Sequence, residues 1–544
     1  MGTDLVNHAL YLDAISAMPG EPLLAHAATR TSAPLSVDIY RIVGTRESRF
    51  EPELEFVMRA PCPSPARYSS RTAERMGPGD ADVSGCQWPA HALVREIPAS
   101  WPSGLYLAQL TERAEPTMKI SPQCGQDALF VLRPSPEASP RPILWQVNVA
   151  TWNAYHIWQN RNLYIGYVGD DTGHSVKELR AHTVSFHRPG IGLASRSNIP
   201  AFPPTAFMYN LALLQWLHDE GIEVDFCAGA DLHAGTVGLG KYRLLLSAGH
   251  DEYWSKPQRD AVEAFVRGGG NAAFLGGNLC FWQIRYSTDL TSLSCYKRGP
   301  DVNPGRGDGE PLDPLYRDPA AYPDHDNSDV TVEYWSAPLG RDTVSLTGVS
   351  MRDLSGEPPD GSANPPCGAA WWWENFGGPA RPARGFRVTE PGHWAFAGTG
   401  LARGDEFGTE QKVVGFECDG LDVDWHDGVP VPSRRNGVPA DLRILAYADC
   451  RDWAEFDYST SPPRRSASNP NKAAAGGVVP IVTFTSGRGT VFTAPSTDWV
   501  HALTSIVDYT DKATPQRILS PSREVQTITR NVLTTLSAST PGDQ

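Results

Sequence analysis

The stretch that decides the fold is KYRLLLSAGHDEYWSKPQRDAVEAFVRGGGNAAFLGGNLCFW, residues 241–282. Its two apolar runs, 243–248 and 272–275, have the length of buried strands. Between them, Ser255 can cap a helix, Pro257 is tolerated in a first helical turn, and three glycines end the helix. The order strand, helix, strand predicts a crossover unit of a parallel sheet. Ligands bind at the carboxyl ends of strands in such sheets, so the polar turns GHDEY and GGN mark the expected site.

The same alternation of strand and helix extends back to residue 143. The apolar strand ILWQVNVAT begins there, an amphipathic helix spans 206–220, and a further strand spans 222–226. Strands that alternate with helices indicate a doubly wound α/β domain, which we place over 139–544. Polar, proline-rich stretches at about 283–330 and 350–410 are expected as insertions in this domain.

A different architecture is expected before this domain. Short alternating segments, such as SVDIYRIVG from Ser36 and GLYLAQL from Gly104, are separated by turns and contain no helical stretch. This pattern is typical of a β-sandwich, expected over 35–138. Residues 1–34 are interpreted as an irregular leader, and the proline-rich run 135–142 is the candidate linker.

Composition excludes several classes of protein. The 544 residues are 40% hydrophobic and 20% charged, so the chain can bury large cores. Forty-seven Lys and Arg against 62 Asp and Glu give a net charge of −15, which disfavours a nucleic-acid partner. No run of about eighteen apolar residues predicts a membrane span, and residues 1–30 show no signal-peptide pattern. Nine Cys without CxxC pairing indicate reduced thiols, so we expect a cytoplasmic protein without a membrane partner.

Several segments together resemble the large (beta) subunit of N,N-dimethylformamidase and its relatives. They are WPSGLYLAQL, ATWNAYHIWQNRNLY, YNLALLQWLHDEGIEVDFCAGADLH, LLLSAGHDEYWS, FVRGGGNAAFLGGN and STDWVHAL. The resemblance covers most of residues 35–540 and is strongest at 205–285. It implies a β-sandwich followed by a flavodoxin-like α/β domain of the class I glutamine amidotransferase type. It also implies a mononuclear ferric iron, held by two tyrosines and a glutamate, that serves to hydrolyse a small amide.

Carried over residue by residue, the resemblance assigns one tyrosine ligand to Tyr253 in GHDEY and the glutamate to Glu333 in TVEYW. The direct match of the second tyrosine falls near Ala212 or Leu213, which cannot be ligands. Tyr209, about one turn earlier, is the expected substitute because residues three or four apart share a helix face. A trivalent iron would deprotonate both phenols and leave positions open for water and an amide oxygen.

Other polar residues are expected around this metal. Glu252, His250 or Glu417 would serve as the base, and Asn278 would donate to a developing oxyanion. The expected substrate pocket consists of Asn153, Tyr155, His156 and Trp254. Zinc is the alternative metal, for which His156 would be a nitrogen ligand. Each assignment has a structural alternative: a solvated turn for His250 and Glu252, a left-handed turn for Asn278, and packing for the pocket residues.

The elbow after the strand holds Asp251, Glu252 and Tyr253 where a glutaminase would carry a cysteine nucleophile, so cysteine catalysis is disfavoured.

The first hypothesis is an iron-dependent hydrolase that cleaves the C–N bond of a small amide or amide-bearing metabolite. The second is a family relative that reuses the metal for another lyase or tailoring reaction. The third is a non-catalytic protein that binds a carbohydrate or peptide with its Trp-rich loops. A homo-oligomer is an open expectation; a small subunit does not follow from the resemblance, because the chain is shorter than the family's type enzyme.

Overall fold

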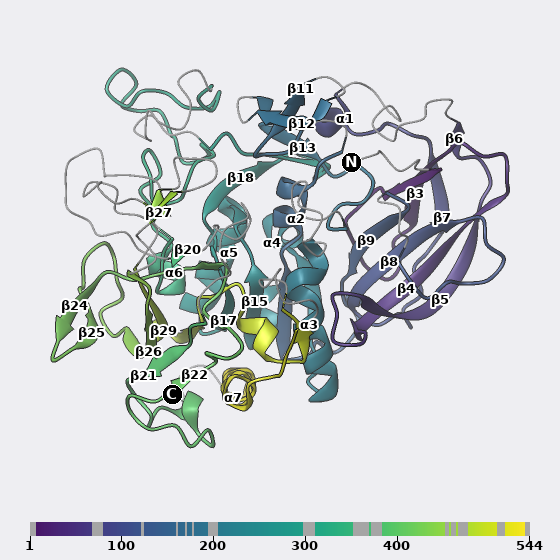
Figure 1. Cartoon of the computed structure of the whole chain (residues 1–544). Helices are drawn as coiled ribbons and strands as arrows, with labels where there is room; N and C mark the ends of the chain where they lie inside the picture. Colours follow the sequence, from purple (N-terminus) through teal and green to yellow (C-terminus); the bar gives the residue numbers. More distant parts are fainter. Residues whose placement is uncertain are drawn as a thin grey trace.

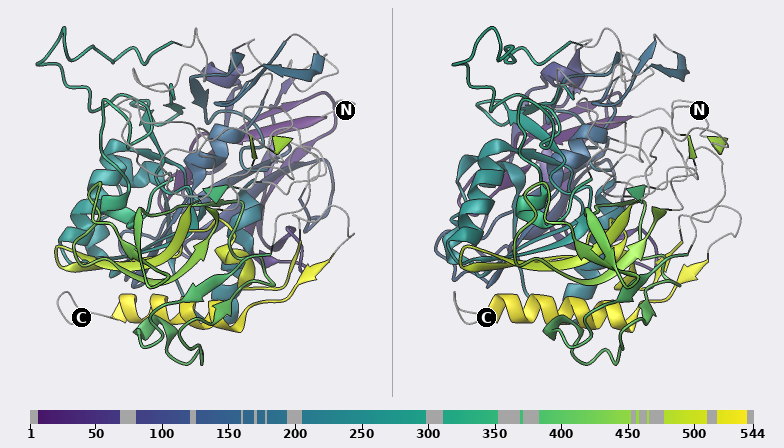
Figure 2. Two further views of the ribbon diagram at one scale, coloured as in Figure 1. Left: turned by 60° about the vertical axis from the view of Figure 1, so that its left-hand side comes forward. Right: turned by 90° about the vertical axis from the view of Figure 1, so that its left-hand side faces the viewer.

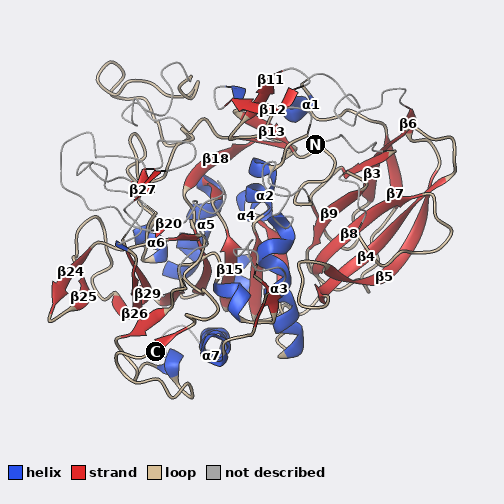
Figure 3. Ribbon diagram, in the orientation of Figure 1, coloured by secondary structure: helices blue, strands red, loops and turns tan. Residues whose placement is uncertain are grey.

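The computed structural model describes residues 7–67, 80–120, 125–158, 161–168, 171–176, 179–193, 205–297, 311–351, 369–370, 383–451, 456–457, 464–465, 477–508 and 517–538. Parts of both expected insertions, 298–310, 352–368 and 371–382, lie outside these residues. Strands dominate over helices (Figure 3), and a β-sandwich lies beside a mixed layer of sheet and helices (Figure 1). The mixed α/β architecture is confirmed at this level, and the likeness to glutamine amidotransferases stays a prediction. In the described part of the chain, no helix is long and apolar enough to cross a membrane.

The N-terminal sandwich consists of two sheets that share one core. In the first sheet, β3 (Leu23–Thr29) pairs with β1 (His8–Leu12), β6 (Ala66–Arg67) and β7 (Ala90–Val94). The second has the order β2 (Ser16–Ala17), β9 (Asp127–Leu132), β8 (Gly104–Thr111), β4 (Leu35–Thr45) and β5 (Pro52–Cys62). Alternating apolar side chains of both sheets, such as Leu10 and Ile39, form the core. The expectation of an irregular leader over 1–34 is therefore wrong for its described part, because its short apolar segments supply buried strands to both sheets.

A nine-stranded sheet forms the second part of the molecule. Its order is β14 (Asp225–Ala228), β10 (Ile143–Val147), β15 (Leu244–His250), β17 (Asn271–Gly277), β30 (Gly489–Thr493), β29 (Val478–Ser486), β26 (Arg443–Asp449), β21 (Phe386–Val388) and β22 (Glu406–Phe407). The strands from β14 to β30 are parallel, and those from β30 to β22 are antiparallel. The predicted parallel sheet is thus half of a larger mixed sheet.

Helices cover both faces of the parallel half. Leu244 and Leu246 of β15 share a core with α3 (Thr205–Asp219) and α7 (Arg523–Ala538), and Figure 2 shows α7 along that face. Leu245 faces the other way, into a core with α4 (Gly229–Ala234) and α5 (Lys256–Arg267). This alternation is what a strand buried on both faces requires. The predicted crossover β15–α5–β17 is confirmed.

Shorter elements complete the described fold. The helices are α1 (Ala81–Ser84), α2 (Val149–Tyr155), α6 (Val344–Thr347) and the 3₁₀ turns η3 (Leu239–Lys241), η6 (Trp394–Phe396) and η8 (Trp499–Ala502). One further sheet has the order β13 (Thr183–Ser185), β19 (Ser292–Ser294), β18 (Trp282–Tyr286) and β16 (Tyr253–Ser255). The two-stranded pairs are β11 (Gly166–Val168) with β12 (Asp171–Val176), β20 (Ala369–Ala370) with β23 (Glu417–Cys418), β24 (Val423–His426) with β25 (Val429–Pro432), β27 (Phe456–Asp457) with β28 (Arg464–Arg465), and β31 (Ile506–Val507) with β32 (Ile518–Leu519).

Candidate functional site

The candidate site lies where the order of the parallel strands reverses. Numbered by their place in the chain, the five parallel strands lie across the sheet in the order second, first, third, fourth and fifth. The reversal therefore falls between β10 and β15. Open α/β sheets bind ligands at such a switch point. Strand β10 and the helix after it hold the turn that follows β15: Gln146 Nε2 donates to Asp251 Oδ2 over 2.7 Å, and Thr151 Oγ1 accepts from the Glu252 backbone N–H over 3.0 Å. The predicted turn is therefore fixed from the neighbouring strand.

Glycines let three parts of the backbone approach closely around this turn. Gly249 has a φ of +75°, and a Cβ there would lie 2.4 Å from the Cβ of Tyr209. A Cβ on Gly276 would lie 2.2 Å from the carbonyl oxygen of Gly249, and one on Gly277 would lie 2.2 Å from that of Glu417. The motif GGN thus brings the Glu417 strand directly against the end of β17.

Two phenols and one carboxylate converge at the centre of the site. Tyr155 Oη donates to Glu252 Oε2 over 2.9 Å, and Tyr164 Oη donates to Glu252 Oε1 over 2.7 Å. The two phenol oxygens are 2.9 Å apart, and their rings stack with centroids 4.4 Å apart. The indole N–H of Trp282 also donates to Glu252 Oε1, over 2.8 Å. Glu252 therefore holds the two phenols and the indole together through hydrogen bonds.

His250 joins Glu252 to a second carboxylate. Its Nε2 lies 3.2 Å from Glu252 Oε2 and 2.9 Å from Glu417 Oε2. Asn278 Nδ2 donates to the same Glu417 oxygen over 3.2 Å. All four predicted catalytic residues thus meet in one cluster, in which none of the side chains is more than 7% exposed or lies in a solvated turn.

A lysine provides a buried positive charge beside this cluster. Lys297 is 4% exposed, and its ammonium group donates to Tyr253 Oη. The same nitrogen lies 3.2 Å from the ring centroid of Tyr164 and 4.7 Å from that of Trp282. Tyr253 Oη in turn donates to Tyr164 Oη over 2.5 Å. Aromatic faces stabilise a desolvated cation, so the rings hold this charge next to the phenols.

The electrostatics keep Glu252 ionised and the phenols of Tyr164 and Tyr253 protonated. Burial by itself raises the pKa of Glu252, but the hydrogen bond and charge of His250 and the charge of Lys297 outweigh it and lower the pKa to about 2. Burial raises the pKa of Tyr164 well above that of a free phenol, and the charge of Glu252 raises it further. Burial also raises the pKa of Tyr253 well above that of a free phenol. A bound cation at the phenols would therefore have to displace their protons.

A further carboxyl group lies directly behind Asn278. Asp419 is 1% exposed, and its Oδ2 accepts from the backbone N–H of Leu279 over 3.1 Å. Burial raises the pKa of Asp419 to about 8, the charge of Glu417 adds to this rise, and the Leu279 N–H opposes it. At neutral pH this buried carboxyl group is therefore largely protonated.

Asp419 should make the free energy of unfolding depend on pH. Its pKa is raised from about 3.9 in the unfolded chain, so its stabilising contribution is complete below about pH 4 and is lost as pH rises to about 8. We expect wild type to lose up to about 1.4 kcal/mol per pH unit relative to Asp419→Asn over this window. Urea unfolding of both proteins at several pH values measures the difference. Asp427→Asn, at an exposed position, is the matched control, and parallel curves for wild type and Asp419→Asn would contradict the prediction.

The three sequence-predicted metal ligands occupy different surroundings. The ring of Tyr209 stacks on His501 and meets His250 edge-on, at centroid distances of 5.5 and 6.1 Å. Tyr253 contacts Lys297 and Tyr164, as described above. Glu333 is buried, its backbone bridges to Trp282, and its Oε2 accepts from Ser336 Oγ over 3.3 Å. Their role as a ligand set stays a prediction.

Of the predicted pocket residues, Tyr155 reaches the cluster. Asn153 accepts from the buried Arg188 with its side chain and its carbonyl group, and the carbonyl group of His156 accepts from Arg188 as well. Burial and the charge of Arg188 lower the pKa of His156 well below its usual value. Trp254 is fully buried and packs against Phe274. These contacts give Asn153, His156 and Trp254 packing roles, and contact with substrate stays a prediction.

Three residues of the cluster were not singled out as site residues in the sequence: Tyr164, Trp282 and Lys297. Tyr164 was visible as a polar aromatic residue soon after Tyr155, in the same segment as the first strand. Trp282 closes the stretch that decides the fold. Lys297 gives no local signal, because its importance depends on aromatic rings from three other segments.

The donor set decides which metal would suit this site. Across the described ranges, no group of three or more His, Cys, Asp and Glu side chains is arranged to hold a metal ion. The cluster instead offers two phenol oxygens and one carboxylate, and such hard oxygen donors suit a ferric ion. Two tyrosines and one glutamate of this cluster match the donor types that the resemblance implies for an iron, and the predicted set Tyr209, Tyr253 and Glu333 stays a prediction.

Fold and site together define an α/β protein with a buried cluster of phenols, carboxylates and cations at the carboxyl edge of its sheet. The chain belongs to the N,N-dimethylformamidase beta subunit-like family, whose model for the C-terminal part of that subunit matches residues 57–513. The chain is 32% identical over 99 residues to the N,N-dimethylformamidase beta subunit of Alcaligenes sp, and 31% identical over 99 residues to that of Paracoccus aminophilus. Each match covers 18% of this chain and 12% of the relative.

Proposed function

We propose that the chain hydrolyses the C–N bond of a small amide or amide-bearing metabolite, with a mononuclear ferric iron as cofactor. The observation that carries this proposal is the convergence of Tyr155 and Tyr164 on the two oxygens of Glu252. The family, whose named relatives are N,N-dimethylformamidase beta subunits, supports the reaction class. Because those relatives are subunits by name, association with a further subunit or with further copies of the chain is part of the proposal.

Tyr155, Tyr164 and Glu252 would hold the iron. Their oxygens already lie within 2.9 Å of one another through hydrogen bonds, so they are close enough to share one ion. Zinc, the alternative from the sequence, prefers histidine and cysteine donors, and these three donors are oxygens. When bound, the iron would polarise the amide carbonyl group and lower the pKa of a coordinated water.

The remaining residues would transfer protons and stabilise charge. Amide hydrolysis removes a proton from water and delivers one to the departing nitrogen. Glu417 Oε2 can accept the first proton, and His250 Nε2 lies 2.9 Å from this oxygen. Asn278 holds Glu417 Oε2 in place through its amide N–H. The ammonium group of Lys297, which donates to Tyr253 Oη, would stabilise negative charge that develops nearby.

Metal content and colour test the proposal. The purified chain should contain one iron and absorb visible light, because tyrosinate bound to ferric iron gives a charge-transfer band. Tyr155→Phe and Tyr164→Phe should each weaken or shift this band. Hydrolysis is followed as amine released from formamides and from larger amides. An active protein without iron would overturn the proposed site. So would a coloured protein whose visible band is unchanged by both substitutions.

A further inference from the structure

Helix α3 joins the α/β sheet to the N-terminal sandwich. It packs against strand β4 of the sandwich (Figure 1), and Gln215 Oε1 of α3 accepts from the Thr45 backbone N–H over 3.2 Å. A Cβ on Gly44 would lie 2.0 Å from the same Gln215 oxygen, so helix and strand are in close contact at this point. Small-molecule sites are common where two domains meet, so a cavity at this joint is a candidate binding site.

Residues next to this contact line a cavity of about 260 Å³. Its walls come from β4, from the end of α3 and from the chain that enters β14, and they are mainly apolar: Ile42, Leu214, Leu217, Ile222, Val224 and Phe226. The volume is close to the lower end of the range for small-ligand sites, about 300–1,000 Å³. The cavity shares no lining residue with the cluster around Glu252, so binding here does not depend on iron.

Two polar residues of the cavity wall are already paired within the protein. Ser103 Oγ accepts from the Phe226 backbone N–H over 2.9 Å. The guanidinium group of Arg141 donates to Asp225 over 2.9 Å and to Glu223 over 3.2 Å, so two carboxylates balance its charge. Neither side chain therefore needs a ligand.

Arg41, in the same wall, is only loosely paired. Its Nε is buried and has no hydrogen-bond partner within the described residues. Its Nη1 lies 3.8 Å from Glu55 Oε2, which is beyond hydrogen-bond distance, and the side chain of Glu55 is 61% exposed. Ion pairs this exposed contribute little to stability. Arg41 therefore keeps donor groups that a ligand can use.

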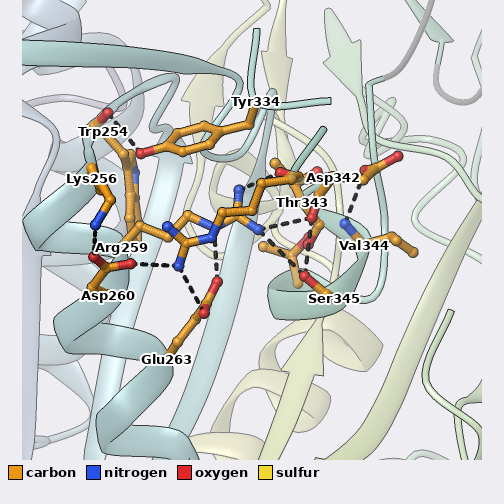
Figure 4. Close-up of polar contacts among 12 residues, drawn as sticks. Trp254, Lys256, Arg259, Asp260, Glu263, Tyr334, Asp342, Thr343, Val344 and Ser345 are labelled. Carbon is orange, nitrogen blue, oxygen red and sulfur yellow. Dashed lines mark hydrogen bonds and ion pairs between the residues drawn. The ribbon is translucent and has the colours of Figure 1, made fainter. Parts of the chain in front are cut away.

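Arg259 shows how this protein pairs a fully buried guanidinium group (Figure 4). It donates to Glu263 over 2.9 Å, and to the carbonyl oxygens of Arg341 and Asp342 over 2.7 and 2.8 Å. A buried donor without a partner costs free energy, which this arrangement avoids. Arg41 has no comparable set of partners among the described residues, so an acceptor from a ligand would complete its pairing.

We propose that this cavity binds a small carboxylic acid with an apolar body, such as a short aliphatic or aromatic acid. The guanidinium group of Arg41 would donate to the carboxylate, because its planar fork matches the two oxygens. The apolar side chains would cover the body, since removing apolar surface from water favours binding. The carboxylate would replace Glu55 in pairing with Arg41 and would satisfy the buried Nε.

Isothermal titration of the chain with hexanoate and with hexanamide compares a charged ligand with a neutral ligand of the same shape. Hexanoate should bind once per chain with a Kd of about 1 mM or tighter, which a ligand of this size can reach. Hexanamide should bind at least about tenfold more weakly, because a hydrogen bond between charged groups is the stronger one. Equal affinities for the two compounds, or no binding of hexanoate, would overturn the proposal.

Two variants locate the binding. Arg41→Gln should weaken hexanoate binding about 10- to 100-fold and change hexanamide binding less than about twofold. Arg49→Gln is the matched control and should bind hexanoate like wild type, since Arg49 pairs loosely with Glu51 at 4.0 Å and does not line the cavity. Leu214→Trp places an indole in the cavity and should remove binding of both compounds. Unchanged hexanoate binding in folded Arg41→Gln and Leu214→Trp proteins would place the acid elsewhere and refute this site.

Discussion

Glu252→Gln should abolish iron binding and lower amide hydrolysis by more than about a hundredfold. The carboxylate accepts hydrogen bonds from Tyr155, Tyr164 and Trp282 and lies 3.2 Å from His250 Nε2. Glutamine keeps one acceptor oxygen, loses the negative charge, and presents an N–H₂ group to donors that need an acceptor. Iron content by elemental analysis and amine release at saturating substrate measure the two effects.

Glu333→Gln is the matched control, because Glu333 is also fully buried and is the glutamate that the sequence assigns to the metal. If Tyr155, Tyr164 and Glu252 hold the iron, Glu333→Gln keeps the metal and its colour. Tyr155→Phe and Tyr209→Phe are compared in the same way: Tyr155→Phe should weaken iron binding, and Tyr209→Phe should keep the metal. Iron lost from Glu333→Gln and Tyr209→Phe, but kept in Glu252→Gln and Tyr155→Phe, would restore the assignment made from the sequence.

Gly277→Ala should destabilise the fold by about 2 kcal/mol or more and also reduce hydrolysis. The new Cβ would lie 2.2 Å from the Glu417 carbonyl oxygen and 2.8 Å from the Thr497 nitrogen, which are backbone atoms that cannot turn away. The Glu417 strand must then move, and Glu417 Oε2 moves away from His250 Nε2. The free energy of unfolding in urea and kcat, measured where the variant is folded, report the two effects.

Gly240→Ala controls for the substitution itself, because a Cβ on Gly240 would meet no atom within 4 Å. It should leave stability and kcat close to those of wild type. A folded Gly277→Ala protein with the wild-type unfolding midpoint and kcat would show that the close approach of these two strands is not needed for the site.

The sequence predicted the crossover unit well because its signals are local. Ser255 was expected as a helix cap, and its Oγ accepts from the Gln258 backbone N–H over 3.3 Å. The strands on either side were found within one or two residues of their bounds, since buried parallel strands read as continuous apolar runs. The first strands were missed because short apolar segments within residues 1–34 become strands only when a partner sheet buries them.

Site residues were most predictable where they follow strands. His250, Glu252 and Asn278 stand at strand ends, and the structure brings them together with Glu417, which was also expected. The resemblance assigned Tyr253 to the metal, and this role stays a prediction; Glu252 beside it accepts hydrogen bonds from Tyr155 and Tyr164. Lys297 and Trp282 owe their roles to contacts between distant segments, which no local pattern encodes.

The approach of Glu417 to the end of β17 also has a consequence for how the protein is made. Glu417 lies 139 residues after Asn278, whereas the crossover unit that carries His250 and Asn278 is a local structure. During synthesis the parallel strands β10, β14, β15 and β17 and the phenols can therefore assemble well before Glu417 leaves the ribosome. A nascent chain or cleavage product that stops before residue 417 would present the phenol cluster while His250 lacks its second carboxylate. Capacity to bind a cation and capacity for proton transfer would then arise at different times in the life of one chain.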